Sequence, residues 1–231
     1  MTKGHPKEKQ TILSAQNLCK SFVQGDNTVC AIKNINFDLL KGESVSIVGP
    51  SGCGKTTLLQ ILGLLRSADS GKVIVNGQNY SRLDENQRTE CRRKSIGFVY
   101  QAHNFLSDFN ALENVSLPLI LKGIEDQEAY AEAKKLLKLL GLERRYGHFP
   151  TALSGGEQQR VAIARSLIHN PDIILADEPT GNLDSGNSRL VVDVLMNLVK
   201  EKGISLVVVT HNEDIARKTD RRLVLKGGSL N

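Results

Sequence analysis

The sequence predicts an α/β protein built on a parallel sheet, and three observations support this class. The first is a pair of apolar runs without alternation, at residues 173–176 and 206–209, which is typical of strands covered on both faces. The second is a short apolar strand, residues 44–48, that enters a glycine-rich loop. The third is the helical spacing of leucine and isoleucine after this loop, over residues 55–65. Together they predict a strand, loop and helix unit within a parallel sheet.

The composition fits one folded domain over residues 1–231. Apolar residues make up 40% and charged residues 24% of the chain, which excludes a disordered or collagen-like protein. No window approaches the roughly 18 consecutive apolar residues of a membrane-spanning helix, and the polar start lacks the apolar segment of a signal peptide. We therefore expect a cytosolic protein with a flexible tail at about residues 1–10.

The charge and the cysteines exclude two further classes. A net charge of +5 would suit nucleic acid, but the basic residues are scattered and only 4% of residues are aromatic, too few for a base-stacking surface. We expect a solvated basic surface and no nucleic-acid partner. The four cysteines lack the spacing of a zinc finger, so we expect reduced thiols at Cys19, Cys30, Cys53 and Cys91.

The middle of the chain differs because its candidate elements are helical. An alanine and leucine stripe predicts a helix over residues 125–140, ended by a glycine, and a second helix is expected over residues 157–168, before a proline. No strand-like run separates them. We expect a helical subdomain at residues 101–159, inserted in a catalytic core of residues 11–100 and 160–231.

Residues 49–56 match the pattern GxxxxGK[ST] of a phosphate-binding loop. Glycines let backbone N–H groups wrap a phosphate, and the helix that follows offers its positive end. Lys55 adds a charge that reaches the β- and γ-phosphates, while the Thr56 hydroxyl would bind Mg²⁺. The predicted nucleotide-binding residues of this loop are Gly49, Pro50, Ser51, Gly52, Cys53, Gly54, Lys55, Thr56 and Thr57.

Two acids, Asp177 and Glu178, follow the apolar run at residues 173–176. In phosphoryl transfer, one acid at a strand end can hold Mg²⁺ through its waters, and a second can deprotonate the attacking water. Acids at a strand end also occur as plain solvated residues, but the phosphate loop in the same chain favours the functional interpretation. We assign Asp177 to the metal and Glu178 to the general base.

These motifs, in this order, resemble the ATP-binding-cassette (ABC) ATPases. Residues 153–159 resemble the family's signature sequence, although Ser154 and Glu157 also form a capping box, and both interpretations can hold. The resemblance extends over about residues 12–231. It implies a P-loop NTPase of the RecA-like type: an ABC nucleotide-binding domain with an inserted helical subdomain and N-terminal antiparallel strands.

The resemblance also implies a head-to-tail homodimer that sandwiches ATP. In the family, the signature loop binds the γ-phosphate of ATP held by the other copy, which assigns that role to Ser154, Gly155 and Gly156. Two departures are visible: Glu157 stands where glutamine is common, and Cys53 where serine is common. We expect ATP turnover to survive both, with Cys53 as a candidate site of thiol sensitivity.

Several residues gain a role only through the resemblance. Gln101, after the strand-like residues 96–100, resembles the glutamine that touches the metal and the nucleophilic water. His211 resembles the switch histidine that contacts the γ-phosphate. Phe22 resembles the aromatic residue that stacks on adenine, although a phenylalanine here would also suit a hydrophobic core. Residues 181–184 resemble the loop that communicates across the dimer, although a plain turn would have the same sequence. The predicted catalytic set is Glu178, His211, Gln101 and Lys55, and the predicted metal ligands are Thr56, Gln101 and Asp177.

Within the family, residues 103–115 resemble the ATPases of bacterial lipoprotein-releasing systems, the LolD group. Asp108 and Phe109 favour this group, whereas Ser107 departs from it because a proline is expected there. The resemblance implies integral membrane permease subunits of the LolC/LolE type, a position on the cytoplasmic face of the bacterial inner membrane, and ATP-driven release of lipoproteins toward the outer membrane. Efflux ATPases of the MacB type and cell-division ATPases of the FtsE type remain alternatives. DNA-repair ATPases of the same family carry coiled-coil or zinc insertions, for which the sequence gives no pattern.

Overall fold

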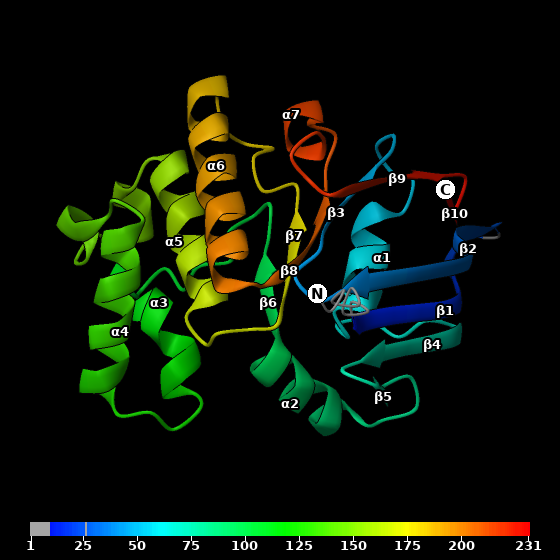
Figure 1. Ribbon diagram of the computed structural model, residues 1–231, viewed down its shortest axis with the longest axis horizontal. Helices are drawn as coiled ribbons and strands as arrows, with labels where there is room; N and C mark the ends of the chain where they lie inside the picture. Colours follow the sequence, from blue (N-terminus) through cyan, green and yellow to red (C-terminus); the bar gives the residue numbers. More distant parts are fainter. Residues whose placement is uncertain (1–9, 26) are drawn as a thin grey trace, which may run out of the picture.

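A computed structural model describes residues 10–25 and 27–231 (Figure 1). The predicted tail lies outside these residues except for Gln10. A six-stranded sheet has the order β10-β9-β3-β8-β7-β6, and a four-stranded sheet has the order β2-β1-β4-β5. The first sheet consists of β3 (Ser44–Val48), β6 (Ile96–Val99), β7 (Ile173–Asp177), β8 (Ser205–Val209), β9 (Arg221–Lys226) and β10 (Ser229–Leu230).

The six-stranded sheet is parallel from β6 to β9, and only β10 pairs in the antiparallel direction. The predicted strand at residues 44–48 is confirmed as β3, and those at 173–176 and 206–209 are each extended by one residue. β3 and β8 are buried along their whole length, which is why their sequences are apolar on both faces. The predicted α/β class is confirmed.

The four-stranded sheet is antiparallel throughout. Its long strands form a hairpin, and in Figure 1 this sheet lies beside α1, away from α3 and α4. The N-terminal antiparallel strands implied by the resemblance are therefore present. The strands are β1 (Thr11–Gln24), β2 (Asn27–Leu40), β4 (Ser70–Val75) and β5 (Gln78–Asn79).

Two hydrophobic cores lie on opposite faces of the parallel sheet. Side chains alternate along β7: Ile173 and Leu175 join the core shared with α1 and the antiparallel sheet, while Ile174 and Ala176 join the core shared with α3 to α6. Each core packs its helices against one face of the parallel sheet. The helices are α1 (Lys55–Leu62), α2 (Glu85–Ser95), α3 (Ala111–Ile120), α4 (Asp126–Leu139), α5 (Gly155–Leu167), α6 (Ser185–Lys202) and α7 (Glu213–Ala216).

The predicted helix ends need small corrections. α1 ends at Leu62 rather than at residue 65, because Gly63 ends the helix and Leu64 adopts a left-handed φ of 60°. α5 begins two residues earlier than predicted because Ser154 is its N-cap. This helix also crosses the predicted boundary between residues 159 and 160. The division into core and helical subdomain remains a prediction, although Figure 1 shows α3, α4 and α5 grouped on one side.

Within residues 10–25 and 27–231, no helix combines the length and apolar character needed to cross a bilayer. The cysteines at positions 19, 30, 53 and 91 are free thiols. Two short 3₁₀ helices, η1 (Glu143–Arg145) and η2 (Pro150–Ala152), connect α4 to α5. They bring a charged turn close to the start of α5, where the predicted signature sequence lies.

Candidate active site

The phosphate-loop sequence forms a tight turn between β3 and α1. Gly52 and Gly54 have positive φ values of 75° and 104°, a conformation that favours glycine. A Cβ on Gly54 would lie 2.7 Å from the carbonyl oxygen of Ala31, and a Cβ on Gly49 would lie 2.3 Å from that of Leu225. The glycines are therefore required both by the turn and by close packing against β2 and β9.

Lys55 is buried and its side chain folds back into this turn. The Nζ atom donates to the carbonyl oxygens of Gly49 at 2.8 Å and Pro50 at 3.1 Å. These bonds hold the ammonium inside the loop, where a phosphate oxygen would replace a carbonyl partner. The predicted phosphate-binding lysine is thus in place before any ligand binds.

Thr56 and Asp177 meet across the boundary between α1 and β7. The Thr56 hydroxyl donates to Asp177 Oδ1 at 3.2 Å. Burial raises the pKa of the Asp177 carboxyl, an effect that the Thr56 hydroxyl partly offsets. A hydroxyl and a half-buried carboxylate form an all-oxygen donor pair of the kind that Mg²⁺ accepts, so these two residues fit the predicted metal site.

Glu178 is held in an unusual conformation at the end of β7. Its φ of 43° lies in the left-handed region, which is uncommon for a glutamate. One carboxylate oxygen lies 2.9 Å from His211 Nδ1, and the other accepts the His211 backbone N–H at 3.2 Å. The Glu178 side chain is only 12% exposed, whereas that of His211 is 70% exposed. The fold therefore brings the predicted base and the predicted switch histidine into direct contact.

A cavity of about 330 Å³ is lined by Lys55, Thr56, Glu178 and His211, and Asp177 is connected to it through its hydrogen bond with Thr56. Gln101, which follows β6, reaches it as well, and its backbone carbonyl accepts a hydrogen bond from Asn182 Nδ2 at 3.3 Å. The predicted catalytic set therefore lies around one space next to the phosphate loop. The lining residues are Ser51, Gly52, Gly54, Lys55, Thr56, Thr57, Gln101, Glu178 and His211.

Two predicted parts of the site lie elsewhere. Phe22 stands on β1, where the Arg66 guanidinium carbon lies 5.2 Å and Lys20 Nζ lies 5.7 Å from its ring centroid. Of the residues that the structure describes, neither Phe22 nor the signature segment at 154–156 lines the phosphate-loop cavity. One chain therefore does not bring the signature loop to its own phosphate loop.

The signature loop forms the start of α5. Ser154 Oγ accepts the Glu157 backbone N–H at 3.3 Å, and the Ser154 N–H donates to Glu157 Oε2 at 2.8 Å. This reciprocal pair confirms the predicted capping box. A Cβ on Gly156 would lie 2.6 Å from Asn187 Oδ1, so this glycine lets α5 approach the start of α6. Ser154 and Gly155 remain exposed.

Residues 32–181 match the family model of the ABC transporter. The chain belongs to this family. Over 95% of its length it is 46% identical to the lipoprotein-releasing system ATP-binding protein LolD of Legionella pneumophila (strain Lens), covering 96% of that protein. Over 96% of its length it is 47% identical to a protein of the same name from Ruegeria sp. (strain TM1040), of which it covers 98%.

Solved structures agree with this assignment. The ATP-binding cassette MJ0796, in a dimeric post-hydrolysis state bound to ADP and Pi, superposes with a TM-score of 0.89 at 42% identity, over 95% of this chain and 97% of that one. A second dimeric MJ0796 structure, of a bacterial ABC transporter cassette, gives the same TM-score at 43% identity. The predicted ABC nucleotide-binding fold is confirmed.

Three contacts around this ABC site were not predicted from the sequence. Asn182 bonds to the Gln101 carbonyl, Arg165 on α5 donates to the carbonyls of His103 and Asn104, and Arg145 binds Glu157. Each partner is at least 12 positions away along the chain, and a pair at such separation leaves no periodic pattern. For the Arg145–Glu157 pair, the one indication in the sequence is the negative charge of Glu157 at a position where glutamine is common, because a partly buried carboxylate needs a positively charged partner.

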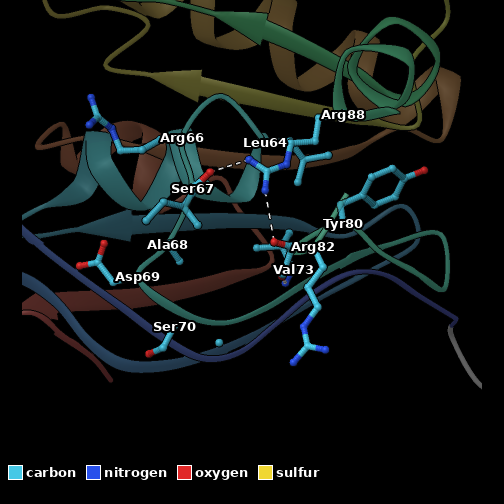
Figure 2. Close-up of a pocket in the computed structure, with 13 residues that line it drawn as sticks. Leu64, Arg66, Ser67, Ala68, Asp69, Ser70, Val73, Tyr80, Arg82 and Arg88 are labelled. Atoms are coloured by element: carbon cyan, nitrogen blue, oxygen red, sulfur yellow. Dashed lines mark hydrogen bonds between the residues drawn. The ribbon is translucent and has the colours of Figure 1, made fainter. Parts of the chain in front are cut away.

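Another cavity, of about 340 Å³, lies between the end of α1, β4 and the start of α2 (Figure 2). Arg88 occupies its centre and donates to Ser67 Oγ at 2.5 Å and to the Ser81 carbonyl at 3.2 Å. This cavity shares no lining residue with the phosphate-loop cavity. Protein groups therefore already bind the Arg88 guanidinium.

Proposed function

We propose that this chain is the ATP-hydrolysing subunit of a complex that releases lipoproteins from the bacterial inner membrane toward the outer membrane. The observation that carries the enzymatic part is the gathering of Lys55, Thr56 and the Glu178–His211 pair around one cavity, with Asp177 bonded to Thr56. The transport part rests on the relatives named for lipoprotein release, which match almost the whole chain.

In this proposal, the phosphate loop binds the triphosphate of ATP through its backbone N–H groups. Lys55 exchanges the carbonyls of Gly49 and Pro50 for β- and γ-phosphate oxygens. Thr56 and Asp177, with Gln101 lining the same cavity as Thr56, would hold Mg²⁺, which would neutralise charge on the phosphates. Phe22 stacks on the adenine, a role that its half-buried ring on β1 permits.

Glu178 accepts the proton of the attacking water. The two contacts from His211 fix this carboxylate in the lining of the cavity, so that it needs no rearrangement to act as a base. His211 is itself largely exposed, and its free ring edge then contacts the γ-phosphate of bound ATP. Glu178, which accepts the proton of the water, and His211, which contacts the γ-phosphate, are thus already in contact with each other.

Two copies are needed to complete the site. Ser154, Gly155 and Gly156 of one copy bind the γ-phosphate held by the phosphate loop of the other, because within one chain these parts are separate. The capping bond uses a lone pair of Ser154 Oγ and leaves its hydroxyl proton to donate to a phosphate oxygen. ATP then stabilises the closed dimer, and hydrolysis removes that stabilisation.

The membrane partner tests the transport part of this proposal. The full-length chain, tagged and expressed in its host, would be purified from detergent-solubilised membranes, and the copurifying subunits identified by mass spectrometry. Integral membrane permease subunits of the LolC/LolE type are expected, with this chain bound to them at the cytoplasmic face of the inner membrane. Recovery of an FtsX-like protein or an efflux permease instead would refute lipoprotein release while leaving the ATPase assignment intact.

A further inference from the structure

A negative charge stands next to the predicted γ-phosphate contact of the signature loop. Glu157 is the third residue of α5, and its carboxylate is only 18% exposed. Its Oε2 atom accepts the Ser154 backbone N–H, so the carboxylate lies one hydrogen bond from the loop. A charge in this place opposes the binding of a triphosphate, because like charges brought together across an interface cost affinity.

Protonation does not remove this charge. Hydrogen bonds from the Arg145 guanidinium and from the Ser154 N–H lower the pKa of Glu157 to about 2. The carboxylate therefore remains ionised at any physiological pH. It also takes up part of the positive end of α5, which would otherwise be available to a bound anion.

Arg145 supplies the opposite charge from a different element. Its Nε atom lies 2.7 Å from Glu157 Oε1, on the side of the carboxylate away from the capping bond. The backbone of η1 fixes this arginine, because the Arg145 N–H donates to the Leu142 carbonyl at 2.9 Å and its own carbonyl accepts the His148 N–H at 3.0 Å. Both carboxylate oxygens are thus engaged, one by the helix cap and one by the guanidinium.

We propose that Arg145 is a positioning residue of the nucleotide site: its guanidinium neutralises Glu157, so that the signature loop can accept the γ-phosphate of ATP bound to a second copy. This inference rests on the proposed function, because it assumes that the loop meets ATP across the dimer. It gives η1, which lies outside the recognised motifs, a role in nucleotide affinity.

The test compares arginine variants in the full-length chain with its membrane partner. R145M removes the charge at similar length, and we expect the KM for ATP to rise about fivefold to tenfold while kcat at saturating ATP changes little. The rise should shrink as salt is added, because ions screen the repulsion between the uncompensated carboxylate and the triphosphate. R144M, which removes the same charge from the exposed neighbouring arginine of η1, is the matched control and should leave KM unchanged.

The double variant decides between charge compensation and a purely structural role. Glutamine at position 157 keeps the capping box but has no charge, so R145M/E157Q should return KM to the wild-type value. If E157Q fails to rescue R145M, or if R145M leaves KM unchanged, the inference is wrong. Should R145M not fold, as judged by thermal unfolding, R145Q makes the same comparison with a neutral hydrogen-bond donor.

Failure of the proposed function has a different signature. If the wild-type chain with its partner does not hydrolyse ATP, or if E178Q turns over at the wild-type rate, the enzymatic proposal fails and this inference fails with it. If both behave as proposed and only the rescue is missing, the inference about Arg145 alone is overturned.

Discussion

The phosphate loop and the signature loop differ in how completely one chain builds them. Around the phosphate loop, Lys55, Thr56 and Glu178 already have protein partners at 2.8 to 3.2 Å. At the signature loop, Ser154 and Gly155 are exposed, and the inward contacts of this segment serve only to cap and pack α5. Under the proposed function, this difference means that one chain preorganises the catalytic groups and leaves the second half of nucleotide binding to another copy.

The largest expected effect comes from the preorganised half. E178Q removes the general base while keeping the shape of the side chain, so ATP hydrolysis should fall by about 10²- to 10⁴-fold. ATP binding should persist, since Lys55 and the glycine loop are unchanged, and a dimer should accumulate. Single-turnover hydrolysis and size-exclusion chromatography with ATP and Mg²⁺ measure both. Wild-type turnover by E178Q would refute the base assignment.

A second large effect, on ATP binding rather than on turnover, is expected from loss of the phosphate-binding charge. K55A removes the ammonium that the loop carbonyls hold, and we expect ATP binding to weaken by at least about a hundredfold. Isothermal titration calorimetry with ATP and Mg²⁺ measures the change, and thermal unfolding shows whether the loop still folds. Unchanged affinity in a folded K55A chain would mean that the cavity is not the nucleotide site.

The smallest effect is on stability and concerns the contact between the C-terminal end of α5 and the parallel sheet. His169 follows α5, and its Nε2 atom lies 3.2 Å from the Ile96 carbonyl of β6. Burial, with a smaller contribution from Lys122, lowers the pKa of His169 to about 4. The folded state thus resists a proton that the unfolded chain accepts near pH 6.5, so stability is highest above that pH and falls below it.

Between pH 7 and pH 5 this one group should lower the free energy of unfolding by about 2 kcal/mol. Urea unfolding at several pH values measures the loss, and H169Q should flatten the dependence by the same amount, because glutamine does not titrate. An equally steep profile in H169Q would show that other groups cause it.

The same contrast explains which features were predictable. The glycine loop, the two acids at the end of β7 and the capping box of α5 are each contiguous in sequence, so their spacing alone predicts their local structure. The helices α2 and α3 were not predicted from the sequence. α2 has no apolar stripe because Cys91 is its buried residue, and α3 contains Pro118, which interrupts a helical pattern. The Arg145–Glu157 pair depends on how the turn after α4 folds back, which no local pattern reports.

The central claim is that the signature loop of one copy completes the nucleotide site of another, and S154D tests it most directly. Aspartate keeps the N-cap of α5 but places a negative charge against the γ-phosphate, whereas S154N keeps the cap without a charge. Multi-angle light scattering of E178Q with ATP and Mg²⁺ should show a dimer, which should persist in E178Q/S154N and be absent in E178Q/S154D. A dimer of undiminished stability in E178Q/S154D, or ATP bound at full affinity by a monomer of E178Q, would contradict the account.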